Sequence, residues 1–305
     1  MLRITTSTAG KEAADYFDAA LSTSDYYASD HGLWGGKGAE RLGLKGQVER
    51  EAFVALAKNL VPRKAKEQLT VRMKSEDGNR RAGYDFTFSV PKSISVYLAE
   101  TSDKAVESMI HDSFTETMTD IEARMETRVR IGGQDRDRTT GNMVYASFVH
   151  RESRPIDGMA DPHFHIHGYV FNATFDPEEG RWKAGQLGNI KADAPFYEAA
   201  FNARLADKLL ATGYGIRRTD RDFELASVNR ELIEKFSKRT RQIEQLARER
   251  YTVIEARARD LVKKTGMEFA DAFAEIRSKL GAESRNKKVP PNLSPKNNWP
   301  IGVLR

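Results

Sequence analysis

The sequence contains no cysteine and no long hydrophobic run, and both absences narrow what the protein can be. Without cysteine there is neither a disulfide framework nor a thiolate-ligated metal. No apolar stretch approaches the roughly 18 residues that a membrane span needs, and the opening MLRITTSTAGKEAADYF lacks the apolar core of a secretion signal. We therefore expect a cytoplasmic protein without membrane insertion. A hydrophobic fraction of 39% and a charged fraction of 30% are typical of a globular chain with a real core.

The net charge of +5 is modest, but it is unevenly distributed. Between Arg204 and Lys264 there are 16 basic and 10 acidic residues, and between Arg277 and Arg305 there are 7 basic residues and 1 acidic residue. Residues 1–203 carry a balance of −4. This distribution fits a basic cover that binds a polyanion next to a mildly acidic catalytic half. The alternative is a solvated helical surface without such a role.

Hydrophobic periodicity predicts an α+β fold, with a central, mostly antiparallel sheet flanked by helices and a helical C-terminal region. Residues 83–98 begin with a strict alternation of apolar and polar residues, which predicts a half-buried strand that Pro91 stops. Residues 143–150 and 164–173 are predicted to be two further strands that pair with each other. Apolar residues at 3–4 spacing or good helix formers predict helices over residues 11–21, 48–59, 103–128, 194–212, 228–264 (one or two helices) and 267–280.

Residues 161–167, DPHFHIH, hold three of the six histidines at alternate positions. On a strand these three side chains share one face, while Phe164 and Ile166 point to the other. Three ligands spaced in this way span roughly 13 Å, which is too far for one ion. Two of them plus His150, which ends the neighbouring strand, meet more easily. We therefore expect His150, His165 and His167 to bind one divalent metal ion (Mg²⁺, Mn²⁺ or Zn²⁺); the alternative is a pH-sensitive histidine cluster without metal.

Nucleophile candidates are Tyr16 and the pair Tyr26-Tyr27 near the N-terminus. A phenol has a pKa near 10 and needs a base or a metal beside it to attack phosphorus. Asp85, on the polar face of the first predicted strand, can orient a histidine or accept a tyrosine proton. The alternatives are tyrosines that only fill a core and an aspartate on an exposed strand face.

Together these segments resemble the TrwC/TraI-type (MobF) conjugative relaxases of the HUH endonuclease superfamily. The resemblance covers residues 1 to about 280. It rests on four motifs in the family's order: Tyr16-Phe17 with Tyr26-Tyr27, WGGKGA at 34–39 with LGL at 42–44, GYDFTFSVPKS at 83–93, and Asp161-Pro162 with His165-Ile166-His167. The implied fold is the palm-like HUH relaxase core with a helical C-terminal lid.

The resemblance implies a metal-dependent single-stranded DNA endonuclease and transesterase. In this family a tyrosine attacks a phosphodiester at the nick site of an origin of transfer, forms a 5′-phosphotyrosyl link and frees a 3′-hydroxyl that can later rejoin the strand. Tyr16 matches the first catalytic tyrosine, Tyr26 the second-round tyrosine and Asp85 the acidic residue beside the metal histidines. Implied partners are single-stranded DNA, accessory relaxosome proteins, a coupling protein and a type IV secretion system.

Basic residues beside the Asp85 strand are candidates for DNA phosphate contacts, namely Arg80, Arg81 and Lys92. Two positions depart from the family pattern. Phe17 replaces a tyrosine that many relatives have. His163 stands where glutamine is common, and it either donates a hydrogen bond to a ligand or competes as a ligand itself. Tyr27 is a further candidate for supporting the metal ligands by a hydrogen bond.

We expect a catalytic core over residues 1–225, a DNA-covering helical extension over 226–285 and a Pro-rich linker or tail over 286–305. No G-x-x-x-x-G-K-[ST] motif occurs, so the chain is expected to be a relaxase domain of a longer protein or a form without a helicase. The competing hypotheses are an HUH-type rolling-circle replication initiator, a metal-dependent phosphodiesterase without a tyrosine nucleophile, and a catalytically silent DNA-binding module.

Overall fold

The computed structural model describes residues 1–8, 32–64, 66–71, 81–153, 155–156, 159–220 and 222–283. The predicted helix at residues 11–21, the side chains of Tyr16, Tyr26, Tyr27 and Arg80, and the predicted tail at 286–305 lie outside these residues. The chain forms two compact units, one made of residues 1–151 and 163–227 and the other of residues 152–162 and 228–305.

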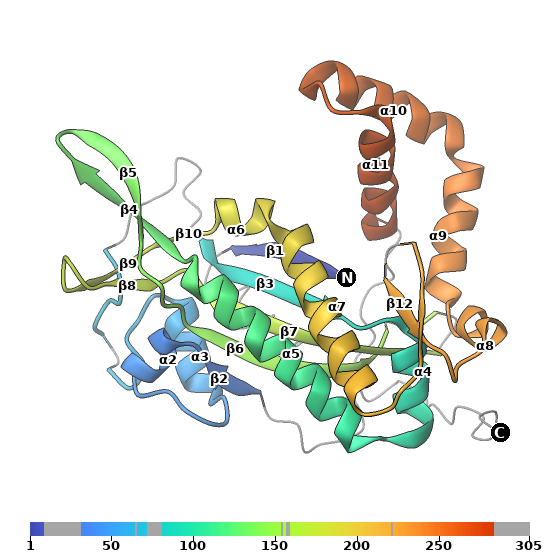
Figure 1. Ribbon diagram of the computed structural model, residues 1–305. Coiled ribbons are helices and arrows are strands. Elements are labelled where there is room, and N and C mark those ends of the chain that lie inside the picture. The colour runs from blue at the N-terminus through green and yellow to red at the C-terminus, as the bar shows by residue number, and fades with distance from the viewer. Residues whose placement is uncertain are drawn as a thin grey trace. The chain divides into compact units, whose positions relative to one another are not determined.

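The first unit is built on a sheet whose described strands follow the order β1-β3-β7-β6-β2 (Figure 1). Their bounds are β1 (Leu2–Thr8), β3 (Arg81–Ser89), β7 (Pro162–Phe171), β6 (Tyr145–Glu152) and β2 (Leu33–Gly35). β3 pairs antiparallel with β1 and with β7, and β2 pairs antiparallel with β6. The combination of this sheet with flanking helices confirms the predicted α+β fold.

Two long helices, α5 (Lys104–Ala123) and α7 (Ala194–Ala211), cover one face of this sheet (Figure 1). The ring of Phe88 on β3 lies 5.3 Å from Phe114 on α5 and 5.3 Å from Phe201 on α7, measured between ring centroids. Phe164 and Ile166 on β7 are also buried, as the alternation of β7 predicted. Because this face is filled by apolar side chains, the odd-numbered residues of β7 are left to the opposite face.

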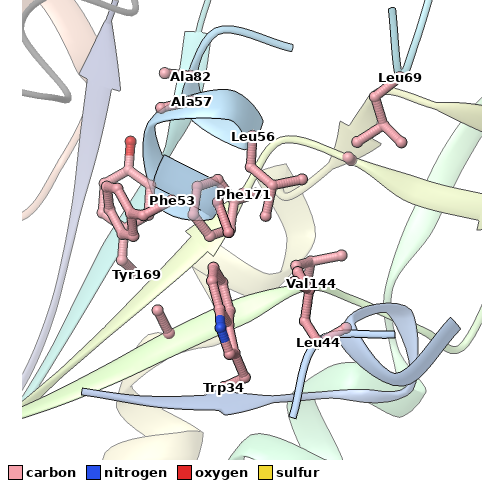
Figure 2. Close-up of a cluster of buried hydrophobic side chains, with 14 of the residues drawn as sticks. Trp34, Leu44, Phe53, Leu56, Ala57, Leu69, Ala82, Val144, Tyr169 and Phe171 are labelled. Atoms are coloured by element: carbon pink, nitrogen blue, oxygen red, sulfur yellow. The ribbon is translucent and has the colours of Figure 1, made fainter. Parts of the chain in front are cut away.

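The opposite face is partly covered by α3 (Arg50–Ala57). Figure 2 shows Phe53 of this helix beside Tyr169 and Phe171 of β7, and both ring pairs have centroids 4.9 Å apart. Trp34 of β2 packs against Phe171 at 6.0 Å. Tyr169 is the last β7 member of this apolar cluster, so the next residues on the same face, His167 and His165, lie beyond it.

Phe53→Ala is expected to lower the free energy of unfolding by about 3–5 kcal/mol, because it removes a fully buried ring that contacts three aromatic side chains. Urea denaturation followed by circular dichroism measures this loss. The matched control is Phe196→Ala, where the ring is 66% exposed, with an expected change within about 0.5 kcal/mol. A loss below about 1 kcal/mol for Phe53→Ala would contradict the packing described for this cluster.

The remaining described elements of the first unit connect or flank the sheet. The strands are β4 (Glu126–Ile131), β5 (Gln134–Thr139) and β10 (Gly185–Gln186) in one small sheet, and the pairs β8 (Thr174–Asp176) with β9 (Arg181–Lys183) and β11 (Ile216–Arg218) with β12 (Phe223–Leu225). The helices are α2 (Lys37–Arg41), α4 (Lys92–Thr101) and α6 (Gly188–Ala192).

The second unit contains four described helices and the chain segment 152–162. The helices are α8 (Arg230–Lys235), α9 (Lys238–Glu249), α10 (Tyr251–Thr265) and α11 (Phe269–Glu283). α10 and α11 meet through the rings of Tyr251 and Phe273, whose centroids are 5.5 Å apart. Among the helices described in the two units, none is long and apolar enough to cross a lipid bilayer.

The structure corrects the prediction for residues 83–98. β3 is a central strand with buried residues on both faces, not a half-buried one, since its polar Asp85 and Ser89 are 8% and 6% exposed. The alternation was real, but its polar face lines a site instead of facing water. Pro91 ends the strand as predicted and also serves as the N-cap of α4, because a proline that cannot continue a ladder is well suited to begin a helix.

Two helix predictions were too long. The helix expected over 103–128 ends at Ala123, because the alternating Thr127, Val129 and Ile131 belong to the strand β4. The charged region 228–264 forms parts of three helices instead of one or two. The breaks between α8, α9 and α10 contain no proline or glycine, so the sequence carries no helix-stop signal at these positions.

Candidate metal centre

Three histidines from two neighbouring strands face one another in the first unit. His165 and His167 come from β7, and His150 comes from the adjacent β6. One ring nitrogen of each lies within 4.8 Å of the others. The ring centroids are 5.2 Å apart for His150 and His165, 4.9 Å for His150 and His167, and 5.0 Å for His165 and His167.

Hydrogen bonds fix which nitrogen of two of these rings is available. The Nδ1 of His167 lies 2.8 Å and 3.0 Å from the two carboxylate oxygens of Asp85, and the Nδ1 of His165 lies 2.8 Å from the backbone carbonyl of His163. Carboxylate and carbonyl oxygens only accept hydrogen bonds, so each Nδ1 carries the proton and donates it. The Nε2 lone pairs of His165 and His167 are therefore the ones left for a ligand.

The protonation state of His165 suits metal binding. Burial lowers the pKa of His165 well below its usual range, and the neighbouring imidazoles lower it further. Burial also lowers the pKa of His163 to about 4, with the positive charge of Lys92 contributing. Because these rings are neutral at pH 7, His165 has a lone pair on Nε2 without having to lose a proton first.

The residues present fit a divalent cation. Three neutral imidazoles are a common protein donor set for one such ion that keeps open positions. The carboxylate of Asp85, bonded to His167, completes the carboxylate–histidine arrangement that fixes a ligand ring in place. His163 lies outside the converging group: its ring is 4.6 Å from that of His165, and its Nε2 is 3.4 Å from the Ser89 hydroxyl.

Sequence reasoning missed two hydroxyl side chains beside these rings. The Thr87 hydroxyl lies 3.3 Å from Nδ1 of His167 and 3.4 Å from a carboxylate oxygen of Asp85, and Ser89 faces His163. Thr87 is opposite His167, and Ser89 is opposite His165, in the β3–β7 register. The signal was available, because Thr87 and Ser89 share the polar face of the strand with Asp85.

The two described residues predicted to bind phosphates lie in different surroundings. Lys92 begins α4 and is close enough to His163 to influence its pKa. Arg81 begins β3, is exposed, and lies opposite Thr8 of β1. Asp85 comes four positions after Arg81 in β3, roughly 13 Å along the strand. Of the two cations, Lys92 is therefore the one beside the histidines.

Asp85→Asn is expected to weaken divalent metal binding by about 10–100-fold. Asparagine can still accept the His167 hydrogen bond, but it removes the negative charge that strengthens this ring as a ligand. Isothermal titration with Mn²⁺ measures the change. Asp137→Asn is the matched control, since Asp137 forms an ion pair with Arg128 on the small sheet and should leave the affinity unchanged. Equal affinities for Asp85→Asn and wild type would remove Asp85 from the centre.

Known proteins share the sequence pattern and the fold that hold this histidine cluster. The family model described as TrwC relaxase matches residues 10–296. The chain belongs to the TrwC relaxase family. This membership confirms the resemblance that the motifs indicated.

Solved structures of TrwC relaxases agree with this assignment. The structure of conjugative relaxase TrwC in complex with oriT DNA, in a metal-bound form, is 31% identical, with a TM-score of 0.78 over 95% of this chain and 92% of that one. A copper-bound TrwC complex with oriT DNA is also 31% identical, with a TM-score of 0.74 over 92% of this chain and 99% of that one.

A longer relative is the multifunctional conjugation protein TraI of Escherichia coli K12. It is 32% identical over 190 residues, which are 59% of this chain. The match spans only 10% of the length of TraI.

Proposed function

We propose that this protein nicks single-stranded DNA at a defined site and transfers the strand through a 5′-phosphotyrosyl intermediate, initiating conjugative transfer of plasmid or mobile-element DNA. The observation that carries the proposal is the convergence of His150, His165 and His167 beside Asp85 on the sheet of a TrwC-family fold. TrwC structures of the same fold contain oriT DNA and, in some cases, a metal.

In this proposal the three histidines hold one divalent ion (Mg²⁺, Mn²⁺ or Zn²⁺), which supplies the positive charge that polarises a phosphate oxygen. Asp85 keeps His167 in one tautomer and one orientation through the bond to Nδ1. It is also our candidate for accepting the phenol proton. The carbonyl of His163 orients the His165 ring in the same way. We therefore assign His163 the role of supporting a metal ligand.

Tyr16 is proposed as the first nucleophile and Tyr26 as the second, with Tyr27 beside it. The phenol oxygen bonds to phosphorus, and the 3′-oxygen of the preceding nucleotide leaves. The length of chain between β1 and Tyr16 supports this proposal. Thr8 at the end of β1 lies opposite Arg81, roughly 13 Å along the strand from Asp85. Tyr16 is eight residues further on, a reach of up to about 26 Å.

DNA contacts are proposed to come from Arg80, Arg81 and Lys92 and from the helical extension. We keep residues 1–225 as catalytic core, 226–285 as DNA-covering extension and 286–305 as linker. Accessory relaxosome proteins, a coupling protein and a type IV secretion system are the proposed partners, and the cytoplasm is the proposed compartment.

Several phosphate contacts should make the affinity for single-stranded DNA fall steeply with salt, by about 0.7 log units per contact and decade of salt.

The direct test is incubation of the protein with a pool of labelled single-stranded oligonucleotides and Mn²⁺. We expect a covalent protein–DNA adduct that survives denaturing electrophoresis, requires the ion and is lost with EDTA. The same sequences as perfect duplexes should form no adduct. Metal-dependent cleavage that yields only free 5′-phosphates would instead support the phosphodiesterase hypothesis, and binding without cleavage would support a silent DNA-binding module.

A further inference from the structure

The connection between the two ligand-bearing strands is a β arm that belongs to the second unit. It comprises residues 152–162, of which 152–153, 155–156 and 159–162 are described. The N–H of Ser153 donates to the carbonyl of Asp161 at 2.9 Å, and the N–H of Asp161 donates to the Ser153 hydroxyl at 3.1 Å. Ile156 and Met159 exchange two further backbone hydrogen bonds. The arm is thus a built element with a defined place for the Asp161 side chain.

The Asp161 carboxylate is bound to the first residue of α9. It is 3% exposed, accepts the backbone N–H of Lys238 at 2.8 Å and lies 3.5 Å from the Lys238 ammonium. The N-cap residue of this helix, Ser237, makes no capping bond, because its hydroxyl donates to the carbonyl of Ile233 at 2.6 Å. Asp161 therefore takes the place of the missing cap from a segment about 77 residues earlier in the chain.

A capping carboxylate stabilises the N-terminus of α9 more than it would stabilise most helix N-termini. The first turn of α9 contains Lys238, Arg239 and Arg241 and no acidic residue. Cations at a helix N-terminus oppose the helix dipole and one another. A buried carboxylate at this end satisfies a backbone donor and offsets the clustered positive charge. Within this unit the Arg239 guanidinium donates to the Gln242 side chain and that of Arg241 to the Lys235 carbonyl, while Arg241 stays exposed, so both cations are anchored at this end of the helix.

We infer that Asp161 is a positioning residue for DNA: it fixes the basic first turn of α9 to the arm that joins the two ligand strands, so that Arg239 and Arg241 are held ready to bind phosphates of a single-stranded DNA. The inference rests on the proposed function for its ligand. It adds a residue that acts on DNA through α9. Asp161 precedes the histidine motif by only a few residues, yet its side chain serves the second unit.

The test compares Asp161→Ala and Asp161→Asn with wild type in the full chain. Asp260→Asn is the matched control, because it breaks an exposed ion pair with Lys264 in the same unit. Hydrogen exchange of a peptide covering residues 236–242, measured without DNA, reports how firmly the cap holds the start of α9. We expect exchange in Asp161→Ala to be about tenfold faster. Asp161→Asn, which keeps an acceptor but not the charge, should show a smaller increase, and Asp260→Asn none.

The second readout is the affinity for a mixed-sequence single-stranded 30-mer in EDTA across a salt series. Asp161→Ala should weaken binding about tenfold at low salt and reduce the salt slope by about 0.7–1.4, the share of one or two phosphates. Mn²⁺ affinity without DNA should stay within about twofold. A cap that only stabilises the fold would change the exchange but not the salt slope.

The inference is overturned if the hydrogen exchange near Lys238 does not change, if the salt slope is unchanged, or if Mn²⁺ affinity falls together with DNA affinity, which would place the role of Asp161 in the metal centre. If Asp161→Ala does not fold, Asp161→Asn carries the same comparisons. Failure of the proposed function is a separate outcome: wild type would then lack salt-dependent DNA binding, while the exchange experiment would still report on the cap.

Discussion

Replacing His165 with alanine is expected to lower the rate of DNA strand cleavage by about three orders of magnitude or more at a fixed, limiting Mn²⁺ concentration. His165 is buried, neutral and oriented by the carbonyl of His163, and it supplies one of the three ring nitrogens that converge in the described part of the chain. Two imidazoles on separate strands bind a divalent ion far more weakly than three. Cleavage of a labelled oligonucleotide, measured under single-turnover conditions, gives the rate.

The matched control is His111→Ala, which removes an imidazole from α5 outside the histidine cluster and should leave the rate within about twofold. Binding of single-stranded DNA in EDTA should be nearly unchanged in His165→Ala, because the phosphate contacts remain. A cleavage rate that survives in His165→Ala, with unchanged Mn²⁺ affinity, would show that the histidine cluster has another role, such as a metal-free pH-sensitive cluster.

Tyr16→Phe is expected to reduce formation of the covalent adduct by at least about 10³-fold, because the substitution removes only the oxygen that would bond to phosphorus. Tyr26→Phe should form the first adduct normally but fail when the adduct is offered a second nick site. The separation of the two steps follows from assigning one phenol to each cleavage. Denaturing gels of the adduct with one and then two labelled oligonucleotides measure both.

Tyr214→Phe controls for the loss of a phenol as such. The Tyr214 hydroxyl donates to Asp103 at 2.6 Å, and Asp103 also accepts from Tyr97 and caps α5. This variant should lose about 1 kcal/mol of stability and retain full adduct formation. Adduct formation that persists in Tyr16→Phe but is lost in Tyr26→Phe would exchange the two proposed roles, and persistence in both would remove tyrosine attack at these positions.

The part of the site that the sequence predicted is the part encoded by short-range alternation. Histidines at positions i and i+2 must share a strand face, and a histidine that ends the next strand lies beside them if the two strands pair as neighbours. The structure brings His150, His165 and His167 together in this way. The alternation of β3 likewise put Asp85 on a polar face, and the register then set it beside His167.

What the sequence did not predict depends on contacts between distant segments. Nothing near Asp161 indicates that its carboxylate caps a helix beginning at Lys238. Similarly, the alternation of β3 predicted a half-buried strand, but burial depends on what packs above the strand, which local pattern does not encode. The breaks between α8, α9 and α10 also lack a proline or glycine, and the first of them contains Ser237, whose hydroxyl donates to the Ile233 carbonyl in the preceding helix.

Peptide mass mapping of the adduct formed with Mn²⁺ tests the central claim most directly, since it asks whether a tyrosine near the N-terminus and the histidine-bound ion act on the same phosphate. After digestion by a protease and a nuclease, the account predicts a nucleotide linked through a 5′-phosphate to the peptide containing Tyr16, formed only with the ion and absent in His165→Ala. A link to any residue other than Tyr16, Tyr26 or Tyr27, or an adduct that forms equally well without the ion, would contradict it.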